Sequence, residues 1–136
     1  MAYSSITKPG DYFNTVLWTG NGSTMTITGV GFNADLVWVK LRSGSDDNRL
    51  FDQVRGINKY VISNSNSTET TDAILSTTSD GYNLASAGEV TANGGTFVGW
   101  NWKANGAGSS NSDGTIASTV SVNTTAGFSI VSYVGG

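Results

Sequence analysis

The stretch that decides the fold is residues 35–65, DLVWVKLRSGSDDNRLFDQVRGINKYVISNS. Its first part, LVWVKL at residues 36–41, alternates between two faces, and a period of two among β-branched and aromatic residues is typical of a β-strand. Two shorter apolar runs follow at residues 50–54 and 60–62, separated by loops rich in Ser, Gly, Asp and Asn. This pattern predicts an antiparallel unit of short strands, and flanking segments must complete its core.

Further strands are predicted on both sides of this stretch. They lie at residues 13–19, 25–27, 82–84, 96–102, 116–122 and 127–134. No window of the sequence shows the apolar spacing of an amphipathic helix, and charged residues make up only 12% of the chain. About eight or nine short strands at this spacing predict an all-β fold, a two-sheet antiparallel β-sandwich with the jelly roll as its nearest variant.

The 136 residues are expected to form one domain. Residues 1–12 are polar, end in a turn signal and predict an N-terminal arm, and residues 13–136 predict the sandwich itself. Residues 104–114, ANGAGSSNSDG, are of low complexity and predict a flexible loop. We expect this loop and the first ten residues of the arm to be ordered only through contacts with partners.

Composition argues against several classes of function. The net charge is −3 without a basic stripe, which argues against nucleic acid as a partner. The sequence has no signal peptide and no apolar run near the roughly 18 residues of a membrane span, so we expect a soluble protein with no membrane partner. Histidine and cysteine are absent, which removes the commonest general base and the thiolate nucleophile. We therefore expect no cofactor, no catalytic residues and no enzyme.

Oxygen-bearing side chains cluster in one loop, at Asp46, Asp47 and Asn48, as they would in a calcium site. The loop lacks the spacing of an EF-hand, so a solvated loop is favoured and no metal site is predicted. The two glutamates, Glu69 and Glu89, lie in polar loops, and the sequence does not pair them as a glycosidase would require.

The four tryptophans admit either a core role or stacking against sugar rings. Trp38, Trp100 and Trp102 lie on predicted strands, and we expect them to fill the core. Trp18 lies beside a glycine-rich turn that contains Asn21, and we expect it to be the exposed aromatic residue of a ligand site.

Arg55 follows Asp52 by three residues, which predicts a structural ion pair; binding of an acidic glycan is a secondary interpretation. The candidate ligand-binding residues are therefore Trp18, Asn21, Asp46, Asp47, Asn48 and Arg55.

One internal similarity stands out. Residues 127–135, GFSIVSYVG, echo residues 12–20, YFNTVLWTG, so that the chain looks as if it stops where a second copy of the module would begin. Either amphipathic strands simply look alike, or the unit follows another copy, or a partner, end to end.

Four motifs in order carry a resemblance over most of the chain. They are DLVWVKLR at 35–42, LFDQVRG at 50–56, SDGYNL at 79–84 and VGWNWKA at 98–104. With them, the chain resembles a domain of structural proteins of tailed bacteriophages, especially marine and cyanobacterial phages. It departs from the family pattern at Asn101, where that family often has Cys.

The resemblance implies a concanavalin A-like β-sandwich located in the virion, assembled in the host cytoplasm, with no catalytic residues to carry over. We expect a non-enzymatic virion structural protein, either a tail- or fibre-associated module or a capsid decoration protein. Its expected partners are copies of itself and other virion proteins. The alternatives are an adhesin that binds host surface glycan and a carboxylate-based glycan depolymerase.

Overall fold

A computed structural model describes residues 6–135 of the chain, and the first five residues of the predicted arm lie outside that range. The described part contains twelve β-strands, a single turn of 3-10 helix and one four-residue α-helix. Their bounds are η1 (Pro9–Asp11), β1 (Phe13–Thr19), β2 (Met25–Ile27), β3 (Leu36–Leu41), β4 (Arg49–Asp52), β5 (Lys59–Ile62), β6 (Thr70–Thr71), β7 (Ile74–Thr78), β8 (Gly81–Leu84), α1 (Gly88–Thr91), β9 (Thr96–Trp102), β10 (Ser109–Asn111), β11 (Ser118–Asn123) and β12 (Phe128–Tyr133). The prediction of an all-β fold is confirmed.

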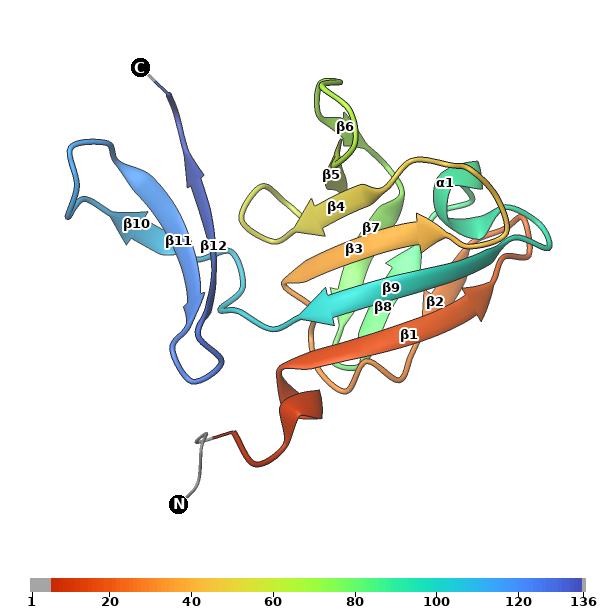
Figure 1. Ribbon diagram of the computed structural model, residues 1–136, viewed down its shortest axis with the longest axis horizontal. Coiled ribbons are helices and arrows are strands. Elements are labelled where there is room, and N and C mark those ends of the chain that lie inside the picture. Colours follow the sequence, from red (N-terminus) through yellow and green to blue (C-terminus); the bar gives the residue numbers. More distant parts are fainter. Residues whose placement is uncertain (1–5, 136) are drawn as a thin grey trace.

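The strands form three antiparallel sheets. A six-stranded sheet has the order β1-β9-β3-β4-β5-β6, a second sheet has the order β2-β8-β7, and a third has the order β10-β11-β12. Figure 1 shows β7 and β8 lying behind β3 and β9, so the first two sheets face each other, whereas the third sheet stands beyond the end of β9. The molecule therefore has a two-layer body and a C-terminal sheet attached at one end.

The three strands predicted within residues 35–65 are β3, β4 and β5, and they are neighbours in the six-stranded sheet. Val37 lies opposite Phe51, and Phe51 lies opposite Tyr60. Their side chains alternate with outward-facing neighbours, as the period of two requires, and all three are buried. The prediction that this stretch forms an antiparallel unit is confirmed.

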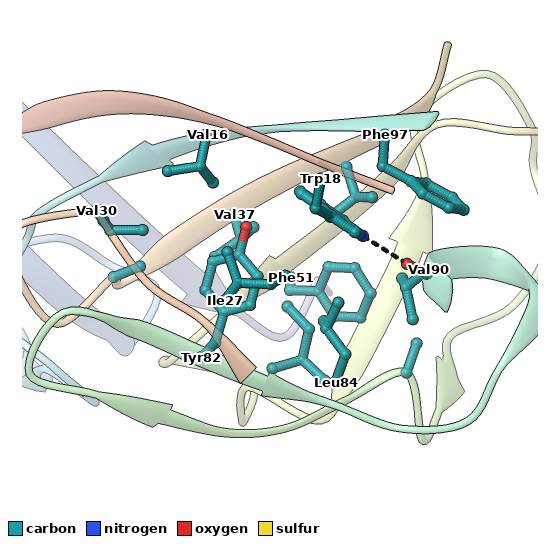
Figure 2. Close-up of a cluster of buried hydrophobic side chains, with 14 of the residues drawn as sticks. Val16, Trp18, Ile27, Val30, Val37, Phe51, Tyr82, Leu84, Val90 and Phe97 are labelled. Carbon is teal, nitrogen blue, oxygen red and sulfur yellow. Dashed lines mark hydrogen bonds between the residues drawn. The ribbon is translucent and has the colours of Figure 1, made fainter. Parts of the chain in front are cut away.

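The core lies between the two facing sheets (Figure 2). The six-stranded sheet contributes Val37, Phe51 and Phe97, and β8 contributes Tyr82 and Leu84, all fully buried. Burying one side chain of this size stabilises a fold by about 1.5–3 kcal/mol relative to leaving it in water. Packing between the two layers is therefore the main source of stability in the body.

Gly99 allows the closest packing in this core. It lies in the middle of β9, opposite Val16 on one side and Val39 on the other. A Cβ atom at Gly99 would overlap the hydroxyl oxygen of Tyr82 and would press against the ring of Trp18. Glycine in a strand interior is costly, and here it is required because two aromatic side chains pack directly on the backbone.

The segment 104–114, expected as a flexible loop, contains a strand instead. β10 pairs with β11, with Ser109 opposite Val120. The segment is also fastened at its start, where the carboxylate of Asp35 accepts hydrogen bonds from the backbone N–H groups of Ala104 (2.6 Å) and Gly106 (3.1 Å). Composition suggested flexibility because small polar residues bury little surface, but backbone pairing and one buried carboxylate supply the missing order.

A double-mutant cycle tests the packing at Gly99. We expect Gly99→Ala to lower the free energy of unfolding by about 1–3 kcal/mol, because the added methyl group overpacks the core. We expect Tyr82→Phe alone to be neutral or to stabilise by about 1 kcal/mol, because the Tyr82 hydroxyl is buried without a hydrogen-bond partner among the described residues.

In the double variant, removal of the Tyr82 hydroxyl should restore part of the free energy of unfolding that Gly99→Ala removes. Urea denaturation followed by tryptophan fluorescence measures the free energy of unfolding of each variant. Strictly additive effects of the two substitutions would contradict the contact.

Candidate functional site

Trp18 is in the core, and the prediction that it is exposed is wrong. Only 9% of it is exposed, its ring stacks on Phe97 at 5.5 Å, and its indole N–H donates to the carbonyl oxygen of Val90 at 2.8 Å (Figure 2). The turn after it begins at Gly20, which is buried and whose N–H donates to the Gly95 carbonyl. A turn signal beside an aromatic residue therefore did not mean access to solvent.

The other three tryptophans lie on the outer face of the six-stranded sheet, and the prediction that they fill the core is wrong. Trp38 is directly opposite Trp100, with ring centroids 5.5 Å apart, and both are only partly buried. Trp102 lies further along the same face of β9 and is also partly buried. The sequence did indicate this outward orientation for Trp38, because alternation places it on the same face as Lys40, whose charge favours solvent.

Together these residues make an apolar surface that we call the outer aromatic face: Phe13, Leu17, Trp38, Trp100 and Trp102. Phe13 is 40% exposed and Leu17 is 62% exposed. Trp102 packs against Phe13 at 4.9 Å and is stacked by Phe128 of β12 at 6.2 Å. The C-terminal sheet therefore contacts one end of this face.

The loop Asp46–Asn48 is organised by hydrogen bonds within the protein. The Asp46 carboxylate pairs with the Arg49 guanidinium at 2.8 and 3.2 Å. The Asn64 amide donates to the Asp47 carboxylate at 2.8 Å, and its oxygen accepts from the Asn48 N–H at 3.0 Å. Burial acts to raise the pKa of Asp46, but the hydrogen bonds and charge of Arg49 outweigh it and hold that pKa below its usual value.

Within residues 6–135, no group of three or more carboxylate, histidine or cysteine side chains is placed to hold a metal ion. The oxygens of the Asp46–Asn48 loop point largely at Arg49 and Asn64. This arrangement stabilises the end of β4 and its neighbour β5.

Arg55 forms the ion pair predicted for it. Its Nε donates to Asp52 at 2.6 Å, one terminal nitrogen reaches Glu69 at 3.4 Å, and the other donates to the Leu50 carbonyl at 2.9 Å. Lys59 also pairs with Glu69, at 3.3 Å. The predicted structural ion pair is confirmed, and it ties β4 to the segment that leads into β6.

The six predicted ligand residues do not form one site. Asn21 is exposed in the turn after β1, where its side-chain oxygen accepts from the Ser23 N–H at 2.8 Å. In the described part of the chain, no hydrogen bond or ion pair joins Trp18, Asn21 or Arg55 to the Asp46–Asn48 loop.

A second apolar surface, which the sequence analysis missed, lies on the C-terminal sheet. We call it the C-terminal face, and it consists of the exposed side chains Ile116, Val122, Val131 and Tyr133. Ile116, Val131 and Tyr133 line a shallow hollow of about 250 Å³. Contiguous exposed apolar side chains of this kind mark interaction sites more often than isolated ones do.

The opposite side of the same sheet faces the body of the protein. Ser121 on β11 is fully buried, and its hydroxyl accepts the backbone N–H of Asn105 at 2.8 Å. Asn123 donates to the Lys103 carbonyl at 3.2 Å. The C-terminal sheet is therefore held through one side and presents apolar side chains to solvent on the other.

These features define an antiparallel all-β domain with two apolar surfaces, one on its large sheet and one on a small appended sheet. The model of a family described as a domain of unknown function, DUF7483, matches residues 8–136, and the chain belongs to this family. Comparison with curated proteins and with solved structures gave no match. Among residues 6–135, no helix is long and apolar enough to cross a membrane.

The joint at Asp35 gives a pH-dependent prediction. Burial raises the pKa of Asp35 in the folded protein, although the amides of Ala104 and Gly106 and the charge of Lys103 act to lower it. The folded state therefore holds this proton more tightly than the unfolded state does. The contribution of Asp35 to the free energy of unfolding is fully present below its unfolded pKa and is lost as pH rises through its folded pKa.

We expect the free energy of unfolding of the parent chain, minus that of Asp35→Asn, to fall as pH is raised from about 3 to about 7. Urea titrations at a series of pH values measure this difference. A difference that grows with pH would show that the two amide hydrogen bonds outweigh burial.

Proposed function

We propose that this domain is a non-enzymatic structural protein of a tailed-bacteriophage particle, either a tail- or fibre-associated module or a capsid decoration protein. Its partners in this proposal are copies of itself and other virion proteins. The observation that carries the proposal is the C-terminal face, where Val131 is 52% and Tyr133 65% exposed.

Burial of these side chains in an interface would stabilise the assembled state, because their apolar surface would be removed from water. Each buried Val or comparable side chain contributes about 1.5–3 kcal/mol to association, before the entropy lost on binding. β12 is also the edge strand of its sheet, so one row of its backbone groups has no strand partner within residues 6–135. An unpaired edge next to an apolar face is suited to pairing with another chain.

The phage context rests on the resemblance described for the sequence. Its four motifs fall at β3, β4, β8 and β9, which surround the core. Motifs in the core support kinship of fold, and the finer assignment to a concanavalin A-like or jelly-roll β-sandwich is part of this proposal. A fold alone does not determine function. The virion location is therefore proposed by analogy with the proteins that the four motifs resemble.

The outer aromatic face favours a second candidate function, binding of host surface glycan. Flat aromatic rings suit the apolar faces of sugars, and indole N–H groups donate to hydroxyls. Trp38 and Trp100 lie side by side on this face, with ring centroids 5.5 Å apart. This surface replaces the Trp18 site that the sequence suggested.

Light scattering over a concentration series tests the structural role. We expect the mean mass of the parent chain to rise with concentration over about 1–100 μM, and the double variant Val131→Ser, Tyr133→Ser to remain monomeric. Leu75→Ser is the matched control, because Leu75 is 52% exposed on β7 of another sheet. A parent chain that is monomeric throughout, or a double variant that associates as the parent does, would contradict self-association through this face.

Fluorescence titration with host polysaccharide tests the second candidate. Trp100→Thr should abolish a saturable change in tryptophan emission, and Tyr133→Ser should retain it, because Tyr133 lies on the C-terminal face. An unfolding transition for each variant establishes that it is folded. Equal binding by Trp100→Thr and the parent chain would remove the outer aromatic face from consideration.

A further inference from the structure

β12 repeats β1 in sequence but not in surroundings. When residues 127–135 are aligned with residues 12–20, Val131 takes the place of Val16 and Tyr133 takes the place of Trp18. Val16 and Trp18 are each 9% exposed on the inner face of the six-stranded sheet. Val131 and Tyr133 are 52% and 65% exposed. The same apolar positions are thus buried in one copy and in water in the other.

We propose that β12 is the first strand of a second module of this fold. In that module it occupies the place of β1, beside the equivalent of β9, with Val131 and Tyr133 turned into the core. The partner is a module of the same fold that has no first strand of its own. This inference rests on the proposed structural role and deepens it by naming the partner.

The glycine at the end of each strand is an independent reason for this assignment. A Cβ atom at Gly20 would overlap the backbone of Thr91 and Ala92, so the place of β1 requires glycine at that position. Gly135 aligns with Gly20, yet a Cβ atom at Gly135 would meet nothing within 4 Å. Among residues 6–135, no neighbouring atom requires a glycine there, whereas the place of β1 in a second module would require one.

Two further positions are compatible with the exchange, whereas Ser129 aligns with Asn14 and would give up the hydrogen bonds of the Asn14 amide to the Gly29 and Val30 carbonyls. Tyr133 keeps an aromatic ring and a hydrogen-bond donor where Trp18 donates to the Val90 carbonyl. Ser132 aligns with Leu17, which is 62% exposed on the outer face, so a serine is accepted there. In the described part of the chain, β1 is an edge strand that pairs with β9 alone, so a replacement must satisfy a single ladder.

The arrangement would join modules without a free linker. β12 stays paired with β11 along six residue pairs in its own module, from Ser118–Tyr133 to Asn123–Phe128. A strand that belongs to two sheets fixes the second module relative to the first. Modules joined in this way would form an end-to-end array, which suits a fibre or tail component.

The first test grafts residues 127–135 in place of residues 12–20 within the full chain. We expect a cooperative urea transition with a midpoint within about 1 M of the parent. One control graft carries residues 126–134 and so shifts the register by one, which turns Val131 and Tyr133 outward and should abolish cooperative folding. A second control carries residues 116–124 of the β11 region, which is equally amphipathic but places Thr124 where glycine is required.

The second test extends the full chain, continuing from Gly135 directly into residues 21–136 of another copy. We expect limited proteolysis to leave both modules intact, and Val131→Asp with Tyr133→Asp to make the second module alone sensitive to protease. A β12 graft no more stable than either control, or a second module digested while the first survives, would overturn the proposal.

These outcomes are separable from the fate of the proposed function. A chain that associates through Val131 and Tyr133 while the β12 graft fails to fold keeps the structural role and overturns the strand assignment. A graft that folds in a chain that remains monomeric supports the strand assignment and contradicts self-association.

Discussion

The rest of the structure depends on the packing of aromatic side chains against the backbone of β9. Because position 99 has no side chain, the ring of Trp18 and the hydroxyl of Tyr82 approach the strand directly, one from the first strand and one from the facing sheet. This contact draws the two layers together around Phe97. It also sets the register in which β1 and β3 flank β9, and hence which side chains of the large sheet face water.

Alternation in the sequence predicted most of the strands, including β1 and β3 with the bounds observed, but it did not predict β6, β7 or β10. Alternation alone did not decide which face of β9 is inside, since both of its faces carry large apolar side chains, and Trp100 and Trp102 were therefore assigned to the core. Trp18 was assigned to the surface because a glycine-rich turn follows it. The order in segment 104–114 was equally hidden, because it comes from Asp35, a residue distant in sequence whose carboxylate caps two amides.

The C-terminal sheet explains why a chain with a complete body still presents so much apolar surface. Ser121, Asn123 and Phe128 hold this sheet to the body, so its orientation is fixed rather than free. On the outward side of this sheet, β12 has exposed apolar residues at positions whose equivalents in β1 are buried. These residues lie next to the edge of β12 that pairs with no other strand among the described residues. An apolar surface held in a fixed orientation is suited to binding another protein of similar architecture. Because few charged groups lie on it, removing this surface from water costs little free energy.

Hydrogen–deuterium exchange at the backbone amides of β12 tests most directly whether this strand completes a second module, when the parent chain is compared with the chain extended from Gly135 by residues 21–136 of another copy, which lacks a first strand. We predict protection confined to the amides paired with β11 in the parent chain and extending to both edges of β12 in the extended chain. The amides of β7, near Leu75, should not change. Exchange at β12 that is the same in the extended chain as in the parent chain would contradict the central claim that this strand completes a second module.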